Sequence, residues 1–205
     1  CTSAVGFDPN YRGALFDLGI GNYRLKNFAA SASAYERYIA LNPANADAHY
    51  RLGLDYMELK RDADAIKFLE KSIELGIKKA DPYYQLGYYR SEAAQYNEAI
   101  KLYKEAIKLD PKDVDAYLEM GNDYNRLKMW TEAMAAFNAA LKLRADSSNA
   151  HLGLGNSYYN QNKYAEALPY YKRAAEISPK WSQAHEYIGD AYRNTDQDVL
   201  AINSY

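Results

Sequence analysis

The chain has 205 residues and a formal net charge of -2 at pH 7. This balance gives no electrostatic reason to expect binding to nucleic acid or to an anionic membrane. A single cysteine excludes an internal disulfide and a CxxC motif, and no apolar run approaches the roughly 20 residues that span a bilayer. Tyrosine is unusually frequent, with 22 copies against five phenylalanines and two tryptophans.

Six glycines recur at a constant interval of 34 residues, without insertion or deletion. They are Gly19, Gly53, Gly87, Gly121, Gly155 and Gly189. A constant period of this length is typical of stacked copies of one supersecondary unit. We therefore number each unit from 1 to 34, with the recurring glycine at position 8.

Within each unit the recurring residues fall on two helical faces. Positions 4, 7, 8 and 11 share one face of a helix, and positions 20, 24 and 27 share one face of a second helix. Small residues at positions 8 and 20 let these helices, A and B, approach closely, and bulky residues at position 24 fill the remaining space. Proline at position 32, as in Pro43, Pro111 and Pro179, ends helix B. Asp81 followed by Pro82 predicts an N-cap and the first turn of a helix A.

In chain order this numbering predicts the end of a preceding repeat, five full helix-turn-helix repeats and a truncated sixth repeat. Their ranges are 1–11; then 12–45, 46–79, 80–113, 114–147 and 148–181; then 182–205. Two turns depart from the pattern, because Gly76-Ile77 and Arg144-Ala145 stand where proline is expected. The period is unaffected, so we expect hairpins there with locally different turns.

This pattern resembles the tetratricopeptide repeat over essentially the whole chain. One repeat carries the family signature almost completely, as Tyr117-x-x-Met120-Gly121-x-x-Tyr124 followed by Ala133, Phe137 and Ala140. The resemblance implies an all-α fold, a right-handed α-solenoid of 34-residue helix-turn-helix repeats. It also implies a concave surface, lined by helix A, that binds protein partners.

Both ends of the sequence fall inside repeats. Cys1 and Tyr205 each occupy position 24, in the middle of a helix B. Two interpretations of Cys1 compete: an arbitrary cut through a preceding repeat, which the match of 1–11 to the numbering favours, and the lipidated N-terminus of an envelope lipoprotein. Cut ends lack the polar caps of terminal repeats, so we hypothesise head-to-tail self-association through them. The compartment, cytoplasmic or periplasmic, stays open.

No constellation of residues in the sequence predicts catalysis. His49, His151 and His185 all occupy position 4, a packing position, and no cysteine or carboxylate recurs beside them at the spacing of a zinc site. No glycine-rich phosphate loop, GxSxG motif or HExxH motif is present. We therefore predict no enzyme activity, no metal and no cofactor.

Positions 5, 9 and 12 of helix A line the concave groove in the family that the chain resembles, and with the adjacent position 13 they indicate where a partner binds. The first half of the chain presents tyrosine and aliphatic side chains there, and the second half mainly amides and arginine. Tyrosine gives a large contact area at little entropic cost, and asparagine both donates and accepts hydrogen bonds. The predicted partner-binding residues are Tyr23, Tyr50, Leu54, Tyr84, Tyr88, Asn122, Arg126, Asn156, Tyr159 and Asn160.

Together these patterns predict a non-catalytic protein–protein interaction scaffold that binds a partner peptide or helix in its concave groove. Position 5 contains no lysine, so the carboxylate clamp of chaperone-binding members of the family is absent. Two alternatives stay open: a structural or self-assembly spacer of a larger complex, and a regulatory domain of a larger enzyme. The expected partners are proteins or peptides, with no nucleic acid and no membrane span.

Overall fold

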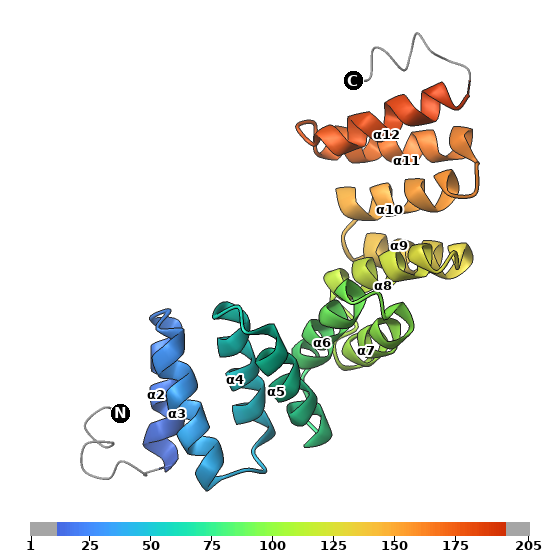
Figure 1. Cartoon of the computed structure of the whole chain (residues 1–205). Coiled ribbons are helices and arrows are strands. Elements are labelled where there is room, and N and C mark those ends of the chain that lie inside the picture. The colour runs from blue at the N-terminus through green and yellow to red at the C-terminus, as the bar shows by residue number, and fades with distance from the viewer. Residues whose placement is uncertain (1–11, 196–205) are drawn as a thin grey trace. The chain divides into compact units, whose positions relative to one another are not determined.

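The computed structural model describes residues 12–195, and every regular element in that range is an α-helix (Figure 1). In chain order the helices are α2 (Arg12–Arg24), α3 (Phe28–Leu41), α4 (Ala46–Glu58), α5 (Asp62–Glu74), α6 (Asp81–Glu92), α7 (Tyr96–Leu109), α8 (Val114–Arg126), α9 (Trp130–Leu143), α10 (Ser148–Tyr159), α11 (Tyr164–Ile177) and α12 (Ser182–Arg193). Even-numbered helices correspond to helix A and odd-numbered helices to helix B. The predicted fold class, an all-α solenoid of helix-turn-helix repeats, is confirmed.

The predicted ends of the array lie outside the described residues. These ends are 1–11, with Cys1, and the part of the sixth repeat after residue 195. The self-association expected through them stays a hypothesis.

Several of the A helices begin with a side-chain cap from the residue just before them. The side-chain oxygen of that residue accepts a hydrogen bond from a backbone N–H three residues later. The pairs are Asn45 with Ala48 (2.9 Å), Asp113 with Ala116 (3.0 Å) and Ser147 with Ala150 (3.3 Å). The prediction that Asp81 caps α6 is wrong, because Asp81 is itself the first helical residue. Its carboxylate accepts hydrogen bonds from the side chains of Tyr50 and Gln85 instead.

In three repeats the position-8 glycine of helix A faces a buried ring at position 24 of helix B, and in the repeat 46–79 Gly53 faces Leu69 instead. A Cβ atom added to the glycine would collide with that ring. The pairs, with the distance from the added Cβ to the nearest ring atom, are Gly19 with Tyr35 (2.5 Å), Gly121 with Phe137 (2.7 Å) and Gly155 with Tyr171 (2.4 Å). The small residue at position 8 and the bulky residue at position 24 therefore pack against each other, and they fix the spacing of the hairpin.

The turns after α2, α4, α6, α8 and α10 are each closed by one residue in the left-handed region, at position 15. These residues are Lys26, Lys60, Ala94, Lys128 and Asn162, with φ between 58° and 61°. The N–H of each donates to the carbonyl three residues earlier, and the next N–H donates to the carbonyl five residues earlier. This is a Schellman motif, which satisfies the last carbonyls of helix A and reverses the chain into helix B.

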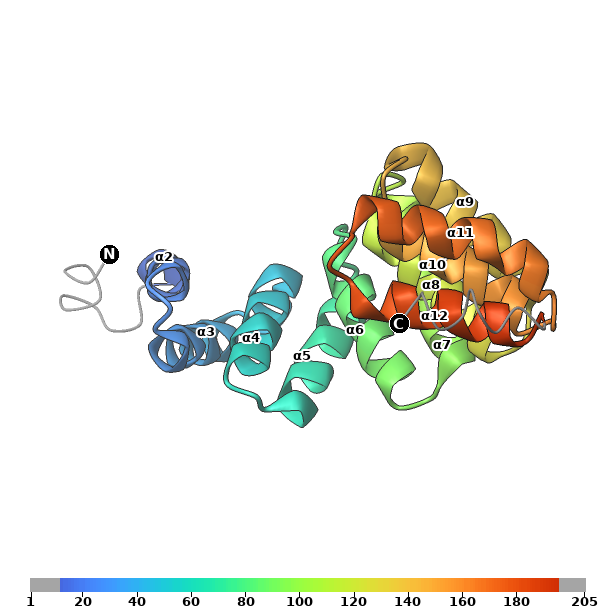
Figure 2. The same ribbon diagram turned by 90° about the horizontal axis from the view of Figure 1, so that it is seen from above.

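The chain consists of two compact units, divided after Tyr89 within α6. In the first unit α2 packs on α3, α3 on α4, and α4 on α5. In the second unit each helix from α7 to α12 packs on the next, and α8 also packs on α10. The last three helices follow this order: α10, α11 and α12 lie one after another in Figure 1, and they overlap in the view from above in Figure 2.

Candidate partner-binding site

In the first unit, the predicted partner-binding residues lie on helix A of three successive repeats. They are Tyr23 on α2, Tyr50 and Leu54 on α4, and Tyr84 and Tyr88 on α6, and we call these five the aromatic surface. Tyr88 is 42% exposed, and the other four are partly buried. Positions 5, 9 and 12 share one face of a helix because they are four and three residues apart. The residues of the aromatic surface therefore lie on the same face of helix A in each of these repeats.

Tyr50 is held in place by the following repeat. Its hydroxyl donates a 2.6 Å hydrogen bond to Asp81 Oδ2, and Lys79 Nζ lies 5.4 Å from the centre of its ring. Burial, followed by the Asp81 carboxylate, raises the pKa of Tyr50, so the hydroxyl keeps its proton. Tyr50 therefore supplies a fixed apolar wall, and its hydrogen bond is already used within the protein.

Tyr23 borders a surface pocket of about 410 Å³, which we call the Tyr23 pocket. Its lining residues are Tyr23, Arg24, Lys26, Phe28 and Glu58, so it lies where the C-terminal ends of α2 and α4 meet the start of α3. The rings of Tyr23 and Phe28 meet edge to face, with centroids 5.4 Å apart. Burial, followed by the nearby Glu58 carboxylate, raises the pKa of Tyr23, so its hydroxyl is a hydrogen-bond donor. Of the residues that line this pocket, only Tyr23 is among the predicted partner-binding residues.

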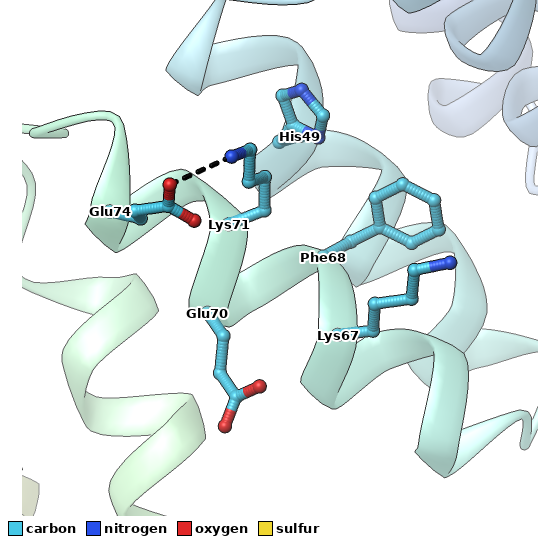
Figure 3. Close-up of a pocket in the computed structure, with 6 residues that line it drawn as sticks. All are labelled: His49, Lys67, Phe68, Glu70, Lys71 and Glu74. Carbon is cyan, nitrogen blue, oxygen red and sulfur yellow. Dashed lines mark hydrogen bonds and ion pairs between the residues drawn. The ribbon is translucent and has the colours of Figure 1, made fainter.

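A second pocket, of about 390 Å³, lies against α4 and α5 (Figure 3). It is lined by His49, Lys67, Phe68, Glu70, Lys71 and Glu74. Figure 3 shows Lys71 paired with Glu74, at 2.9 Å, and Glu70 pointing away from the other side chains. The Phe68 ring stacks on the His49 ring, with centroids 5.9 Å apart. Two lysines and two glutamates balance one another in this pocket, so its charges favour neither an anion nor a cation.

The histidines at position 4 connect the start of a helix A to the turn that precedes it. Their partners are carbonyls at position 32 of the preceding repeat: Pro43 for His49 (2.9 Å), Ala145 for His151 and Pro179 for His185 (3.1 Å). A ring nitrogen that donates its N–H to a backbone carbonyl is not available as a metal ligand. Consistent with this arrangement, no group of three or more potential metal ligands occurs among residues 12–195.

In the second unit, Arg126 lies in a cluster of polar and aromatic side chains. Its Nη1 donates to Ser91 Oγ at 2.9 Å and lies 3.3 Å from Asp123 Oδ1, while its guanidinium stacks 5.3 Å from the centre of the Tyr96 ring. Ser91 also donates to Asp123, at 2.6 Å. Arg126 is thus oriented by the protein but keeps 47% of its side chain exposed.

The predicted amides of the second unit are partly engaged within the protein. Asn156 Oδ1 accepts a 2.9 Å hydrogen bond from the Tyr171 hydroxyl, and Asn122 Nδ2 lies 3.4 Å from Glu119 Oε2. The Tyr159 hydroxyl accepts from Asn194 at 3.0 Å, and Asn160 is exposed at the C-cap of α10. Some of the donors and acceptors of these side chains are therefore already used within the protein and are not available to a partner.

Two fully buried aspartates, Asp55 and Asp123, were not recognised from the sequence. Both occupy position 10 of helix A. Asp123 has the partners described above, whereas neither carboxylate oxygen of Asp55 has a hydrogen-bond partner among residues 12–195. Position 10 is three residues from the buried position 7, so a recurring acid there was a signal of a carboxylate facing the interior.

No helix within residues 12–195 is both long enough and apolar enough to cross a membrane.

Comparison with protein families identifies the class of protein. The chain matches models described as "Tetratricopeptide repeat" over residues 16–83, 119–181 and 152–204, and as "TPR repeat" over residues 94–128. These matches span more than half of the sequence. The chain therefore belongs to the tetratricopeptide repeat family, and its fold is that of a protein-interaction scaffold.

Solved structures share this fold. YrrB, described as "a TPR protein with an unusual peptide-binding site", is 21% identical, with a TM-score of 0.82 over 89% of this chain and 94% of that chain. A MamA structure is 26% identical, with a TM-score of 0.75 over 84% and 94% of the two chains. MamA from Desulfovibrio magneticus RS-1 is 17% identical, with a TM-score of 0.71 over 78% and 90%. No curated protein matches the chain.

Proposed function

We propose that this protein is a non-catalytic recognition module and that a peptide or helix of a protein partner binds to helix A of successive repeats. The observation that carries the proposal is the aromatic surface. Tyr88 is the one aromatic residue among the strongly exposed large apolar residues of the described range, and Tyr84 and Leu54 lie partly exposed on the same face of helix A. Rigidly held aromatic side chains with exposed area are enriched at binding hot spots.

The expected partner segment inserts apolar or aromatic side chains against Tyr50, Leu54, Tyr84 and Tyr88. Tyr50 suits this role because its ring is fixed by Asp81 and Lys79, so little side-chain entropy is lost on binding. In the second unit, Asn122, Arg126, Asn156, Tyr159 and Asn160 are proposed to add polar specificity. The peptide-binding site described for YrrB, which has the same fold, supports this use of the scaffold.

The test is a pull-down from the source cell's lysate with the wild type and the double variant Tyr84→Ala/Tyr88→Ala, followed by identification of bound proteins and calorimetric measurement of their affinity. If both tyrosines are hot spots, the double variant should lose about 2–4 kcal/mol of binding free energy.

A matched control is Leu109→Ala/Leu143→Ala. It removes two similarly exposed apolar side chains, 40% and 42% exposed, from the ends of B helices. Circular dichroism establishes that each variant is folded. Equal affinity of the folded tyrosine variant and the wild type would overturn the proposal and favour a spacer whose A helices bind nothing.

A further inference from the structure

Tyr158 and Tyr170 form a stacked pair of rings between the two helices of the repeat 148–181. Tyr158 lies at position 11 of α10, and Tyr170 lies at position 23 of α11. Their ring planes are 14° from parallel, and the ring centroids are 5.4 Å apart. Both side chains are partly exposed, so small solutes can reach them. The packing of α10 on α11 holds the two rings in this arrangement.

The hydroxyls of this pair are hydrogen-bonded to each other. Burial, followed by the hydrogen bond with the Tyr158 hydroxyl, raises the pKa of Tyr170. In tyrosine the two Cε carbons are bonded to the carbon that carries the hydroxyl oxygen. Because the hydroxyls meet and the rings are nearly parallel, the ring ends that carry the Cε carbons lie side by side.

A second tyrosine pair in the same repeat lacks this arrangement. The rings of Tyr159 and Tyr164 are closer, with centroids 4.9 Å apart, but they meet edge to face at 69°. Their hydroxyls also have separate partners, because Tyr159 accepts from Asn194 and Tyr164 donates to Asn162. Ring proximity alone therefore does not bring the Cε carbons of two tyrosines together.

A third pair, Tyr171 with Tyr187, is stacked but inaccessible. Its centroids are 5.3 Å apart and its ring planes are 27° from parallel. Tyr171 is fully buried, however, and its hydroxyl donates to Asn156. An oxidant in solution does not reach that ring, whereas it reaches both rings of the exposed pair, Tyr158 and Tyr170.

Phenols couple at the Cε carbons when each phenol loses one electron. Loss of an electron, with loss of the hydroxyl proton to water, gives a phenoxyl radical whose unpaired electron is shared between the oxygen and the Cε carbons. Two such radicals form a carbon–carbon bond between their Cε carbons. The hydrogens on those two carbons then move through water to the oxygens, which restores both hydroxyls. Because the protein already holds the rings in contact, the radicals meet without diffusion.

We propose that Tyr158 and Tyr170 are an oxidative cross-linking site, where a peroxide acting through a one-electron carrier joins a Cε carbon of one ring to a Cε carbon of the other. The pair loses two electrons and two protons in all. The peroxide accepts the electrons as its oxygen–oxygen bond breaks, and hydrogen peroxide, which also takes up the protons, becomes two molecules of water.

The new bond joins α10 to α11 within one repeat. It closes the segment 158–170 into a loop, which lowers the entropy of the unfolded chain as a disulfide does, so it stabilises the hairpin. The cross-link is independent of the proposed function, because neither tyrosine is among the proposed partner-binding residues.

The experiment illuminates the full chain, at low concentration, with tris(bipyridine)ruthenium(II) and persulfate. The ruthenium complex is a small one-electron carrier, and persulfate accepts two electrons and becomes two sulfate ions. The monomer is then separated from cross-linked oligomers by size exclusion. Its dityrosine fluorescence is measured, and mass spectrometry of tryptic peptides locates the bond. Lys163 lies between the two tyrosines, so trypsin separates them unless they are cross-linked.

The decisive variant is Tyr170→Phe, with Tyr164→Phe as its matched control. Both tyrosines lie on α11, are partly exposed and contact a tyrosine of α10. Phenylalanine keeps the ring but lacks the hydroxyl that oxidation requires. The wild type should yield linked peptides that contain Tyr158 and Tyr170, lighter by two hydrogen atoms. Tyr170→Phe should lose nearly all dityrosine fluorescence of the monomer, and Tyr164→Phe should retain it.

Circular dichroism establishes that each variant is folded before treatment. The cross-linked wild-type monomer should have a higher Tm than the untreated protein, and treated Tyr170→Phe should show no such rise. Absence of a linked peptide from the wild type, a bond between Tyr159 and Tyr164 in its place, or equal losses of fluorescence in the two variants would overturn the proposed site. An unchanged Tm of the cross-linked monomer would overturn the stabilising effect of the bond.

Discussion

Asp55 is a carboxyl group buried without a hydrogen-bond partner. The nearest groups that could stabilise its charge are Ser31 and Arg51. The Ser31 hydroxyl donates to the Gly19 carbonyl, however, and Arg51 is paired with Asp47 at 2.9 Å. Burial therefore dominates, and it raises the pKa of Asp55 to about 7. In the folded protein this carboxyl group holds its proton up to neutral pH.

The raised pKa predicts a pH dependence of stability. Because the folded state binds the Asp55 proton more tightly than the unfolded state, whose aspartate pKa is about 3.9, the contribution of Asp55 to the free energy of unfolding is fully present below pH ~4 and is lost as the pH rises through 7. Asp55→Asn removes this dependence. From pH 5 to pH 8, the free energy of unfolding of the variant should rise by on the order of 2 kcal/mol relative to that of the wild type. Urea denaturation at both pH values measures this difference.

Asp115→Asn, at an exposed position of α8, is the control for the loss of one negative charge. If Asp55→Asn and the wild type showed parallel pH dependence, the buried carboxyl group would be ionised in the folded protein, contrary to the argument above.

The backbone conformation at position 15 leads to a second prediction at the scale of the residue. Ala94 is exposed and has φ 58°, a conformation that costs a residue with a Cβ about 1–2 kcal/mol. Ala94→Gly removes this strain and loses no packing, but glycine has a larger chain entropy in the unfolded state, which offsets part of the gain. The free energy of unfolding should therefore increase by about 0.5–1 kcal/mol. Thermal unfolding measures it, with Ala135→Gly at an exposed position inside α9 as a control that should lose about 1 kcal/mol.

At the scale of the element, the position-8 glycine packs against the bulky residue at position 24, which is an aromatic ring in three repeats and Leu69 in the repeat 46–79. The pattern of small and bulky residues was sufficient to predict this contact, because both helices are defined by their own periodicity. The same sequence contains glycines with a different role. Gly21 lies exposed in α2, and an added Cβ there would have no atom within 4 Å.

Replacing Gly155 and Gly21 with alanine should therefore change the stability of the protein in opposite directions. Gly155→Ala places a Cβ 2.4 Å from the fully buried Tyr171 ring, and the forced rearrangement should cost about 1–3 kcal/mol. Gly21→Ala has no such contact and should gain about 1 kcal/mol from helix propensity. Urea midpoints of the two variants provide the measurement, and a loss of stability at both positions would show that the contact with the ring is not the cause.

At the scale of the molecule, the period of 34 residues was enough to predict the helices and their order. The Tyr23 pocket could not be predicted, because it depends on Glu58 at the end of α4 facing Arg24 and Lys26, and no periodic pattern relates these residues. The amide side chains were expected to be available to a partner, yet Asn156 already accepts a hydrogen bond from Tyr171. Local spacing shows which face of a helix a residue occupies, but it does not show which neighbour has already used its hydrogen bonds.

The contacts between glycine and ring also bear on how such a protein can change during evolution. Gly19 with Tyr35 and Gly155 with Tyr171 lie within single repeats, and they use positions 8 and 24. Positions 5, 9 and 13, which carry most of the aromatic surface and the amides, supply neither member of those pairs, although Asn156 at position 9 accepts a hydrogen bond from Tyr171. Mutation at positions outside the glycine–ring pairs can therefore change the proposed binding face one repeat at a time while those pairs are retained. The difference between tyrosine in the first unit and asparagine in the second is the kind of divergence that this separation permits.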